Sequence, residues 1–306
     1  MTPLGPAAPH CASAIPVPLD CWGENLTGTP ELVILRFMSD SDRTIHQLAA
    51  SAPSRTAFWV DFLRHVEART VAEIGVYRGE FAEALLKQCP DISTYYMLDP
   101  WRHLGDWEKP ANVEDDTFEK FLAETKDRTE FAADQRTILR GKTTEVIDEI
   151  PNESLDFAYI DGDHTLRGIT IDLLRVYPKL APSGFIGGDD FSATIWQHSG
   201  AYEPTLVFPF AVYFAEAMSA RLYALPHSQF LLQRADAFEF VDLTGRYQDL
   251  GLRAQLAPKA LLRRGAREVR SGLRRLTELA RKPRKRPSPQ PPRAPHPTQN
   301  TPPHPR

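Results

Sequence analysis

Short runs of apolar residues, separated by longer polar stretches, recur through the middle of this 306-residue chain. Each run has about the length of one buried strand, and turn-forming residues bound most of them. Strands are therefore predicted at residues 71–74, 94–99, 136–140, 155–160 and 185–188. Two further runs, 221–225 and 229–234, flank Pro226-His227-Ser228 and predict a closing hairpin.

Most of the stretches around these runs carry apolar residues at helical spacing. The first follows the first strand directly and has Phe81, Ala84 and Leu85 on one face. Other helices are predicted at 44–52, 55–66, 115–126, 166–180 and 208–218, with a further one that Thr143 or Thr144 can cap. Strands that alternate with helices predict an α/β fold with a doubly wound, mostly parallel sheet.

The turn after the first strand contains two glycines, Gly75 and Gly79, and lacks both the G-x-G-x-x-G and the G-x-x-x-x-G-K-[ST] patterns. Glu73 stands two residues before the first glycine. A carboxylate there repels a pyrophosphate and suits a cationic ligand such as an amino group or a sulfonium. Asp99 ends the second strand, where an acid in a doubly wound sheet reaches a ribose hydroxyl. An ordinary strand–turn–helix, with Asp99 as a cap or turn former, is the alternative.

Three carboxylates follow the fourth and fifth strands, Asp161 after the former and Asp189 and Asp190 after the latter. Ligands of open parallel sheets bind at the carboxyl ends of the strands, so these side chains are expected to share one cleft. A hard divalent cation would relieve their repulsion, and Mg²⁺ fits oxygen ligands of this kind. His164 is the candidate general base, since a histidine near its natural pKa suits proton transfer around neutral pH. A helix cap is the alternative role.

Composition divides the chain into segments of different character. The hydrophobic content of 42% supports a real core, and the net charge of −4 hides an asymmetry between the parts. Residues 246–306 carry 16 Lys and Arg against three acids, whereas residues 1–245 carry 20 against 37. The predicted layout is listed in chain order: a flexible segment at 1–30, the catalytic domain with an N-terminal helical cap at 31–245, a basic amphipathic helical extension at 246–282, and a disordered Pro-rich tail at 283–306.

The same features set expectations for location and partners. The chain has no apolar run near eighteen residues, no secretory signal pattern and three scattered cysteines, so a cytoplasmic location is predicted. A small-molecule acceptor is the expected partner. The basic helix is expected to pack weakly on the body, with an anionic membrane surface, RNA or the protein's own acidic domain as alternatives. No specific nucleic acid is predicted, and a homo-oligomer is left open.

The pattern Glu73-x-Gly75-x-x-x-Gly79 resembles motif I of class I S-adenosylmethionine (SAM) methyltransferases. It is most similar to the catechol O-methyltransferase variant, which also has a tyrosine between the glycines, here Tyr77. The resemblance implies a Rossmann-like sheet of seven strands with an antiparallel last strand and helices on both faces. It also implies SAM as cofactor. The residues that it assigns to SAM are Glu73, Gly75, Tyr77, Gly79, Asp99, Asp161 and, on the adenine, Thr143 and Thr144 in a loop similar to Gly-x-Ser-Gln.

The run Asp161-Gly-Asp-His164, followed by Gly-Gly-Asp189-Asp190, resembles the metal-dependent O-methyltransferases over roughly residues 55–235. It looks closest to bacterial families that include macrolide-sugar O-methyltransferases and cephalosporin-hydroxylase-like proteins. The implied function is Mg²⁺-assisted O-methylation of a sugar, phenol or secondary metabolite, with the metal on Asp161, Asp189 and Asp190 and with His164 removing the proton. Two alternatives stay open: a metal-dependent hydroxylase on the same fold, and a non-catalytic binding protein acting through the basic tail.

Overall fold

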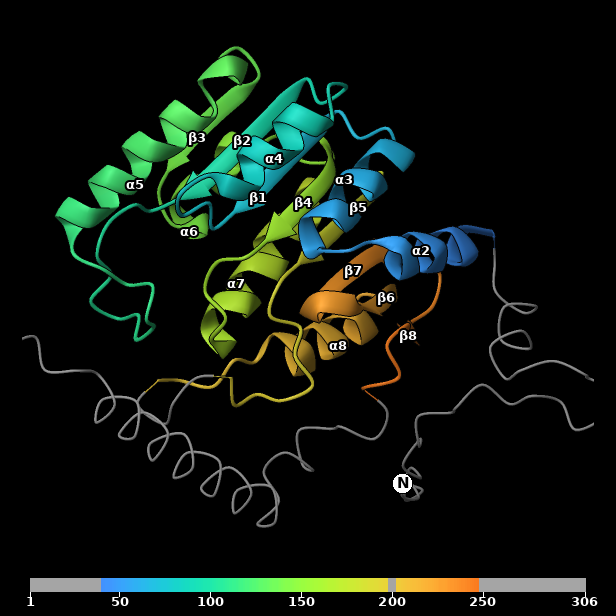
Figure 1. Cartoon of the computed structure of the whole chain (residues 1–306). Coiled ribbons are helices and arrows are strands. Elements are labelled where there is room, and N and C mark those ends of the chain that lie inside the picture. The colour runs from blue at the N-terminus through green and yellow to red at the C-terminus, as the bar shows by residue number, and fades with distance from the viewer. Residues whose placement is uncertain (1–39, 198–201, 248–306) are drawn as a thin grey trace, which may run out of the picture.

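The computed structural model describes residues 40–197 and 202–247, which form one sheet flanked by helices (Figure 1). The sheet has eight strands in the order β3-β2-β1-β4-β5-β7-β6-β8. The strands are β1 (Thr70–Ile74), β2 (Thr94–Asp99), β3 (Arg136–Arg140), β4 (Leu155–Ile160), β5 (Leu180–Gly188), β6 (Ala220–Leu225), β7 (Gln229–Arg234) and β8 (Glu239–Asp242).

The strand order is that of a doubly wound sheet, because the chain runs outward from β1 through β2 to β3 and then returns to place β4 on the other side of β1. Strands β1 to β5 pair in parallel. Strand β7 runs antiparallel to both of its neighbours, β5 and β6. The predicted α/β class is therefore confirmed. The strand order reverses between β1 and β4, where ligands of such sheets bind.

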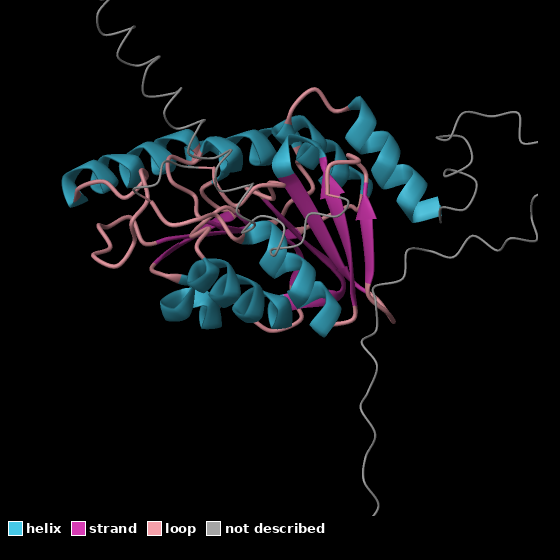
Figure 2. Ribbon diagram, turned by 90° about the horizontal axis from the view of Figure 1, so that it is seen from below, coloured by secondary structure: helices cyan, strands magenta, loops and turns pink. Residues whose placement is uncertain are grey.

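Helices cover both faces of the sheet (Figure 2). They are α2 (Asp40–Ser51), α3 (Arg55–His65), α4 (Glu80–Gln88), α5 (Asp115–Arg128), α6 (Thr143–Val146), α7 (Leu166–Val176) and α8 (Val207–Ala217). Successive strand residues point to opposite faces, so β1 sends Val71 into one core and Ala72 into the other. One core joins the sheet to α2–α5 and the other joins it to α6–α8.

The structure differs from the predicted elements in several places. An eighth strand, β8, pairs in parallel with β6 beyond the predicted hairpin. The helix predicted over 166–180 ends at Val176 and continues as a single 3₁₀ turn that contains Pro178, whose ring is incompatible with a helix interior. Strand β5 begins at Leu180, five residues before the strand predicted at 185–188, and its pairing with β4 shifts register in this added part.

Three sequence predictions lie outside the described residues: the flexible segment at 1–30, the disordered tail at 283–306, and nearly all of the basic helix at 246–282. Among the residues that the structure describes, no helix is both long and apolar enough to cross a membrane.

Candidate active site

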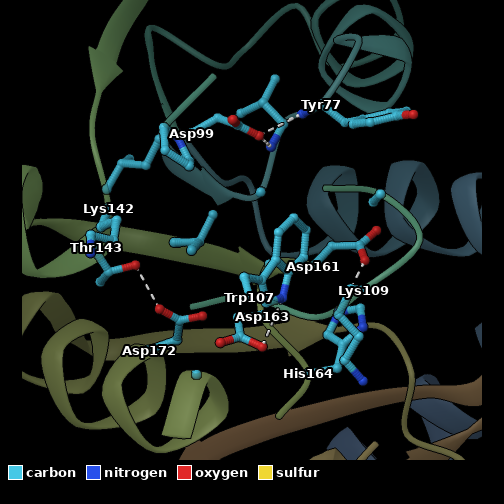
Figure 3. Close-up of a pocket in the computed structure, with 18 of the residues that line it drawn as sticks. Tyr77, Asp99, Trp107, Lys109, Lys142, Thr143, Asp161, Asp163, His164 and Asp172 are labelled. Atoms are coloured by element: carbon cyan, nitrogen blue, oxygen red, sulfur yellow. Dashed lines mark hydrogen bonds and ion pairs between the residues drawn. The ribbon is translucent and has the colours of Figure 1, made fainter. Parts of the chain in front are cut away.

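A pocket of about 530 Å³ opens at the carboxyl ends of the parallel strands. Its wall is formed by the segments that directly follow β1, β2, β3 and β4, together with Asp190 after β5 and part of the loop between β2 and α5. The volume is that of a site for a small ligand or cofactor. All the predicted site residues except Gly79 and Asp189 line this pocket, and Figure 3 shows several of them.

The glycine turn after β1 depends on backbone conformations that favour glycine. Gly75 and Gly79 have φ values of +89° and +75°, and Tyr77 between them has φ +56°. A Cβ at Gly75 would lie 2.3 Å from the carbonyl oxygen of Asp161, so the ends of β1 and β4 approach closely only because this side chain is absent. The turn thereby brings its backbone to the pocket wall.

Asp99 holds this turn in place. Its Oδ2 accepts hydrogen bonds from the backbone N–H groups of Val76 (3.0 Å) and Tyr77 (2.8 Å), and its Oδ1 accepts from the N–H of Trp101 (2.8 Å). Burial raises the pKa of Asp99, and these three backbone donors oppose the rise. The carboxyl lines the pocket, as a side chain that binds a ribose must, and it also orders the adjacent turn.

Glu73 is a fully desolvated acid in the pocket wall. Its side chain is buried at the end of β1 and its Oε2 accepts a hydrogen bond of 2.7 Å from the hydroxyl of Tyr95. Burial raises the pKa of Glu73 well above its usual value, although the Tyr95 hydrogen bond acts in the other direction. A cation bound beside Glu73 would stabilise the ionised form.

The loop after β3 lines the pocket through Gly141, Lys142, Thr143 and Thr144. The prediction that Thr143 or Thr144 caps the following helix is wrong: Lys142 is the N-cap residue, and Glu145 Oε2 accepts from its backbone N–H at 2.9 Å.

Thr143 does not cap the helix but connects the loop after β3 with α7. Its hydroxyl donates a 2.6 Å hydrogen bond to Asp172 Oδ1 on α7 (Figure 3). Burial raises the pKa of Asp172 to about 7.

The three carboxylates predicted to gather do so, but they have protein partners. Arg55, the first residue of α3, contacts Asp189 and places its Nη1 3.3 Å from Asp161 Oδ2. His164 contacts Asp190 through Nδ1, and its Nε2 lies 3.4 Å from Asp161 Oδ1. Two positively charged or chargeable side chains thus stand between three acids.

The environment of His164 differs from the expectation that its pKa is near the natural value. The ring is buried, and burial by itself lowers the pKa of His164. Asp161 and Asp190 outweigh this effect and raise the pKa to about 9. At neutral pH the ring is therefore mostly an imidazolium, with roughly 1% in the neutral form that can accept a proton.

The predicted metal ligands do not fit a divalent ion as they stand. Among the described residues, His, Cys, Asp and Glu side chains form no group of three or more that could hold a metal ion. Asp189 Oδ1 accepts from Gln229 Nε2 (2.6 Å) and from the Asp190 N–H (2.7 Å), while Oδ2 faces Arg55. Both oxygens of Asp189 are therefore occupied by N–H donors.

Several pocket residues were not predicted, among them Arg55, Lys109 and Asp172. Arg55 and Asp172 had no sequence signal, because an arginine at the start of a helix and an acid inside one are common. Trp107 and Lys109 come from the loop between β2 and α5. The Trp107 indole donates to Asp163 Oδ1 (3.1 Å) and Lys109 Nζ donates to the Glu203 carbonyl (2.9 Å), which holds the loop against the pocket.

Residues 72–191 match the family described as a methyltransferase domain. The matched stretch begins in β1, ends just after the carboxylate pair and contains every predicted site residue. This stretch of the chain is therefore similar to a methyltransferase domain, which agrees with the resemblance noted in the sequence.

Three individual proteins illustrate the similarity, each at low sequence identity. The uncharacterized protein y4gI of Sinorhizobium fredii is 25% identical over 153 residues, which are 46% of this chain and 16% of that protein. The SAH-bound methyltransferase PaMTH1 of Podospora anserina superposes with a TM-score of 0.45 at 14% identity, covering 70% of this chain and all of that one. An O-methyltransferase of Bacillus cereus in complex with SAH superposes with a TM-score of 0.44 at 17% identity, covering 66% of this chain and 94% of that one. These likenesses are too weak for their ligands or reactions to be carried over.

Proposed function

We propose that this protein transfers a methyl group from SAM to a hydroxyl oxygen of a small molecule. The observation that carries the proposal is the acidic pocket beside the glycine turn, within a domain that matches a methyltransferase family. Four acids at the strand ends line this pocket, namely Glu73, Asp99, Asp161 and Asp190. Acids beside the glycine turn favour a cationic ligand over a phosphate-bearing one. A sulfonium is a ligand of that charge.

In this proposal the donor spans the pocket from β1 to β3. Glu73 and the turn from Gly75 through Tyr77 to Gly79 hold the methionine part, and Asp99 holds the ribose. Thr143 and Thr144 face the adenine. Asp161 lies between the donor and the acceptor, since it follows β4 next to the glycine turn and also faces Arg55 and His164.

The proposed reaction is an in-line displacement. The acceptor oxygen bonds to the methyl carbon while the carbon–sulfur bond breaks, and the electron pair of that bond goes to sulfur to give S-adenosylhomocysteine. The hydroxyl proton leaves to His164 or to water. The positive donor disfavours the imidazolium and thereby increases the neutral fraction of His164 that can act as base. Mg²⁺ assistance, which the sequence predicted, is left out because the carboxylates already have N–H partners.

Titration calorimetry of the full chain with SAM and with SAH tests the donor. We expect a Kd below about 100 μM for both, and at least tenfold weaker binding in Glu73→Gln and Asp99→Asn. The matched controls Glu216→Gln and Asp134→Asn alter exposed acids away from the pocket and should bind as the parent does. Absence of SAM binding at about 1 mM would exclude the proposal. Transfer of labelled methyl from SAM to phenols and sugars then tests the acceptor.

A further inference from the structure

The cluster of three carboxylates is paired with a positively charged side chain of the protein itself, Arg55. Asp161, Asp189 and Asp190 come from two adjacent strand ends, and such a group of acids needs positive charge nearby. Arg55 supplies a guanidinium that contacts Asp189 and approaches Asp161 to 3.3 Å. Its position is fixed by the start of α3, where Ser54 caps the helix by accepting from the Ala57 N–H at 3.2 Å.

A buried hydrogen-bond network holds Asp189 in its pairing with Arg55. Gln229 is 1% exposed, and its Oε1 accepts hydrogen bonds from the Trp59 indole (2.9 Å) and the Tyr159 hydroxyl (2.8 Å). These donors fix the orientation of the amide, so Nε2 must point the other way and donate to Asp189 Oδ1 at 2.6 Å. Both oxygens of Asp189 are then bound to N–H groups, and the side chain anchors Arg55 instead of a metal.

The cluster already contains a fixed positive charge. Three carboxylates face the guanidinium of Arg55, which stays protonated in proteins, and the imidazole of His164 contacts two of them. A divalent ion would have to enter beside that guanidinium, and repulsion between the two cations disfavours this.

We propose that Arg55, anchored by Asp189 and Gln229, takes the place of a divalent cation in this pocket, and that the acceptor is a phenolic or similarly acidic hydroxyl. Arg55 lines the pocket and its side chain is 41% exposed, so it is accessible to an acceptor bound there. Its N–H groups can stabilise a developing oxyanion by hydrogen bonds.

The acceptor class follows from the chemistry of that cation. A guanidinium does not bond to the acceptor oxygen as a metal does, and so it lowers the pKa of a hydroxyl far less. The hydroxyl must then be acidic itself. A phenol, with a pKa near 10, meets this need, whereas an aliphatic hydroxyl has a pKa closer to that of water, about 15.7. This part of the inference rests on the proposed methyl transfer, but the replacement of the metal by Arg55 does not.

Mn²⁺ binding to the full chain tests the Arg55 assignment without any turnover. We expect the parent to bind Mn²⁺ at this site no more tightly than about 1 mM, by electron paramagnetic resonance titration. Arg55→Gln frees the carboxylates and should bind at least tenfold more tightly, and adding Asp189→Asn should remove that gain. Arg55→Lys keeps the charge and should resemble the parent. Arg64→Gln, at the other end of α3, is the matched control.

Two results would overturn the assignment. One is Mn²⁺ binding by the parent at micromolar concentration that Asp189→Asn abolishes. The other is a folded Arg55→Gln variant, with a circular dichroism spectrum like that of the parent, that gains no Mn²⁺ affinity.

The acceptor class has its own test. With SAM and a simple phenol in EDTA, we expect the parent to turn over at its full rate. Arg55→Gln should lose about 100-fold in kcat while its Kd for SAM changes less than threefold. Transfer to sugars with no transfer to phenols would contradict the acceptor class, whereas a requirement for added metal would contradict the assignment of Arg55. Failure to bind SAM would instead contradict the proposed function.

Discussion

Asp172 is a buried acid in the pocket wall, and its environment changes its pKa. It lies on α7 with 5% of its surface exposed, and the described hydrogen bond to its carboxyl comes from Thr143. Such a group is most stable when neutral, because burial penalises its charged form. Its pKa of about 7, compared with 3.8 for an ordinary aspartate, makes the stability of the fold depend on pH.

The direction of that dependence follows from proton binding. The unfolded chain loses the Asp172 proton near pH 3.8 and the folded chain keeps it until about pH 7. Stability contributed by this group is therefore fully present below the unfolded pKa and is lost as pH rises through the folded pKa. Between pH 5 and 8 the loss spans about two pH units at 1.36 kcal/mol each, or about 3 kcal/mol.

Asp172→Asn removes this titration and keeps an oxygen that can accept from Thr143. We expect the stability of the variant relative to the parent to rise by about 3 kcal/mol between pH 5 and 8, measured by urea unfolding. Asp134→Asn, an exposed site, should show no such change. Parallel pH profiles for Asp172→Asn and the parent would mean that Asp172 is ionised in the folded protein.

Residue-level prediction from the sequence succeeded where neighbours along the chain decide the outcome. Asp161 follows β4, and Asp189 and Asp190 follow β5, so their meeting could be predicted from the sheet order. The partners of these acids were missed, because Arg55 reaches Asp189 from 134 residues away and Gln229 from 40. The raised pKa of His164 depends on the same long-range packing and could not be anticipated from its position three residues after Asp161.

At the scale of elements, α2 is joined to the far edge of the sheet by a polar network. Asp42 is buried and accepts hydrogen bonds from the Tyr223 hydroxyl (2.5 Å) and from Arg221 Nη1 (3.1 Å), both on β6. Arg221 also pairs with Glu239 on β8 at 2.5 Å. One arginine thus connects a helix with the strand that the hydrophobic pattern did not predict.

Removal of the acceptor should loosen this edge of the fold. Asp42→Ala leaves the Tyr223 hydroxyl and Arg221 without a buried carboxylate, and we expect a loss of about 3 kcal/mol in unfolding free energy. Asp40→Ala is the matched control, since Asp40 lies on the same helix and pairs with Arg43 in solvent, where such pairs contribute about 0–1 kcal/mol. Equal losses in the two variants would mean that burial of Asp42 has no energetic consequence.

The hydrophobic pattern also decides which helices and strands could be predicted from the sequence. Strands β2, β3, β4 and β7 begin and end at the predicted residues. For β2 and β4 the reason is that buried strands in a parallel sheet appear as nearly continuous apolar runs. Strand β8 was missed because all four of its residues are only partly buried and Glu239 and Asp242 interrupt the apolar pattern. Helix α2 starts at Asp40, four residues before the prediction, because the acids of its first turn carry no hydrophobic signal.

At the scale of the whole molecule, the pocket joins parts of the chain that are far apart in sequence. Its wall contains residues from Arg55 on α3 to Asp190 after β5, and the strands between them form one continuous sheet with a core on each face. A ligand that contacts several strand ends at once should bind the folded chain and not the unfolded one. Its binding free energy should then appear as stability of the whole domain.

Thermal unfolding with SAM measures that coupling. At a SAM concentration 100 times its Kd, we expect a stabilisation of about 2.7 kcal/mol and an increase in Tm of roughly 5–10 °C. Glu73→Gln should lose most of the increase at the same SAM concentration, because its weaker binding reduces the ratio of ligand to Kd, while Glu216→Gln should keep it. An unchanged Tm for a parent that binds SAM by calorimetry would mean that SAM also binds the unfolded chain, or binds away from the strand ends. A pocket formed by the carboxyl ends of the parallel strands does not allow either result.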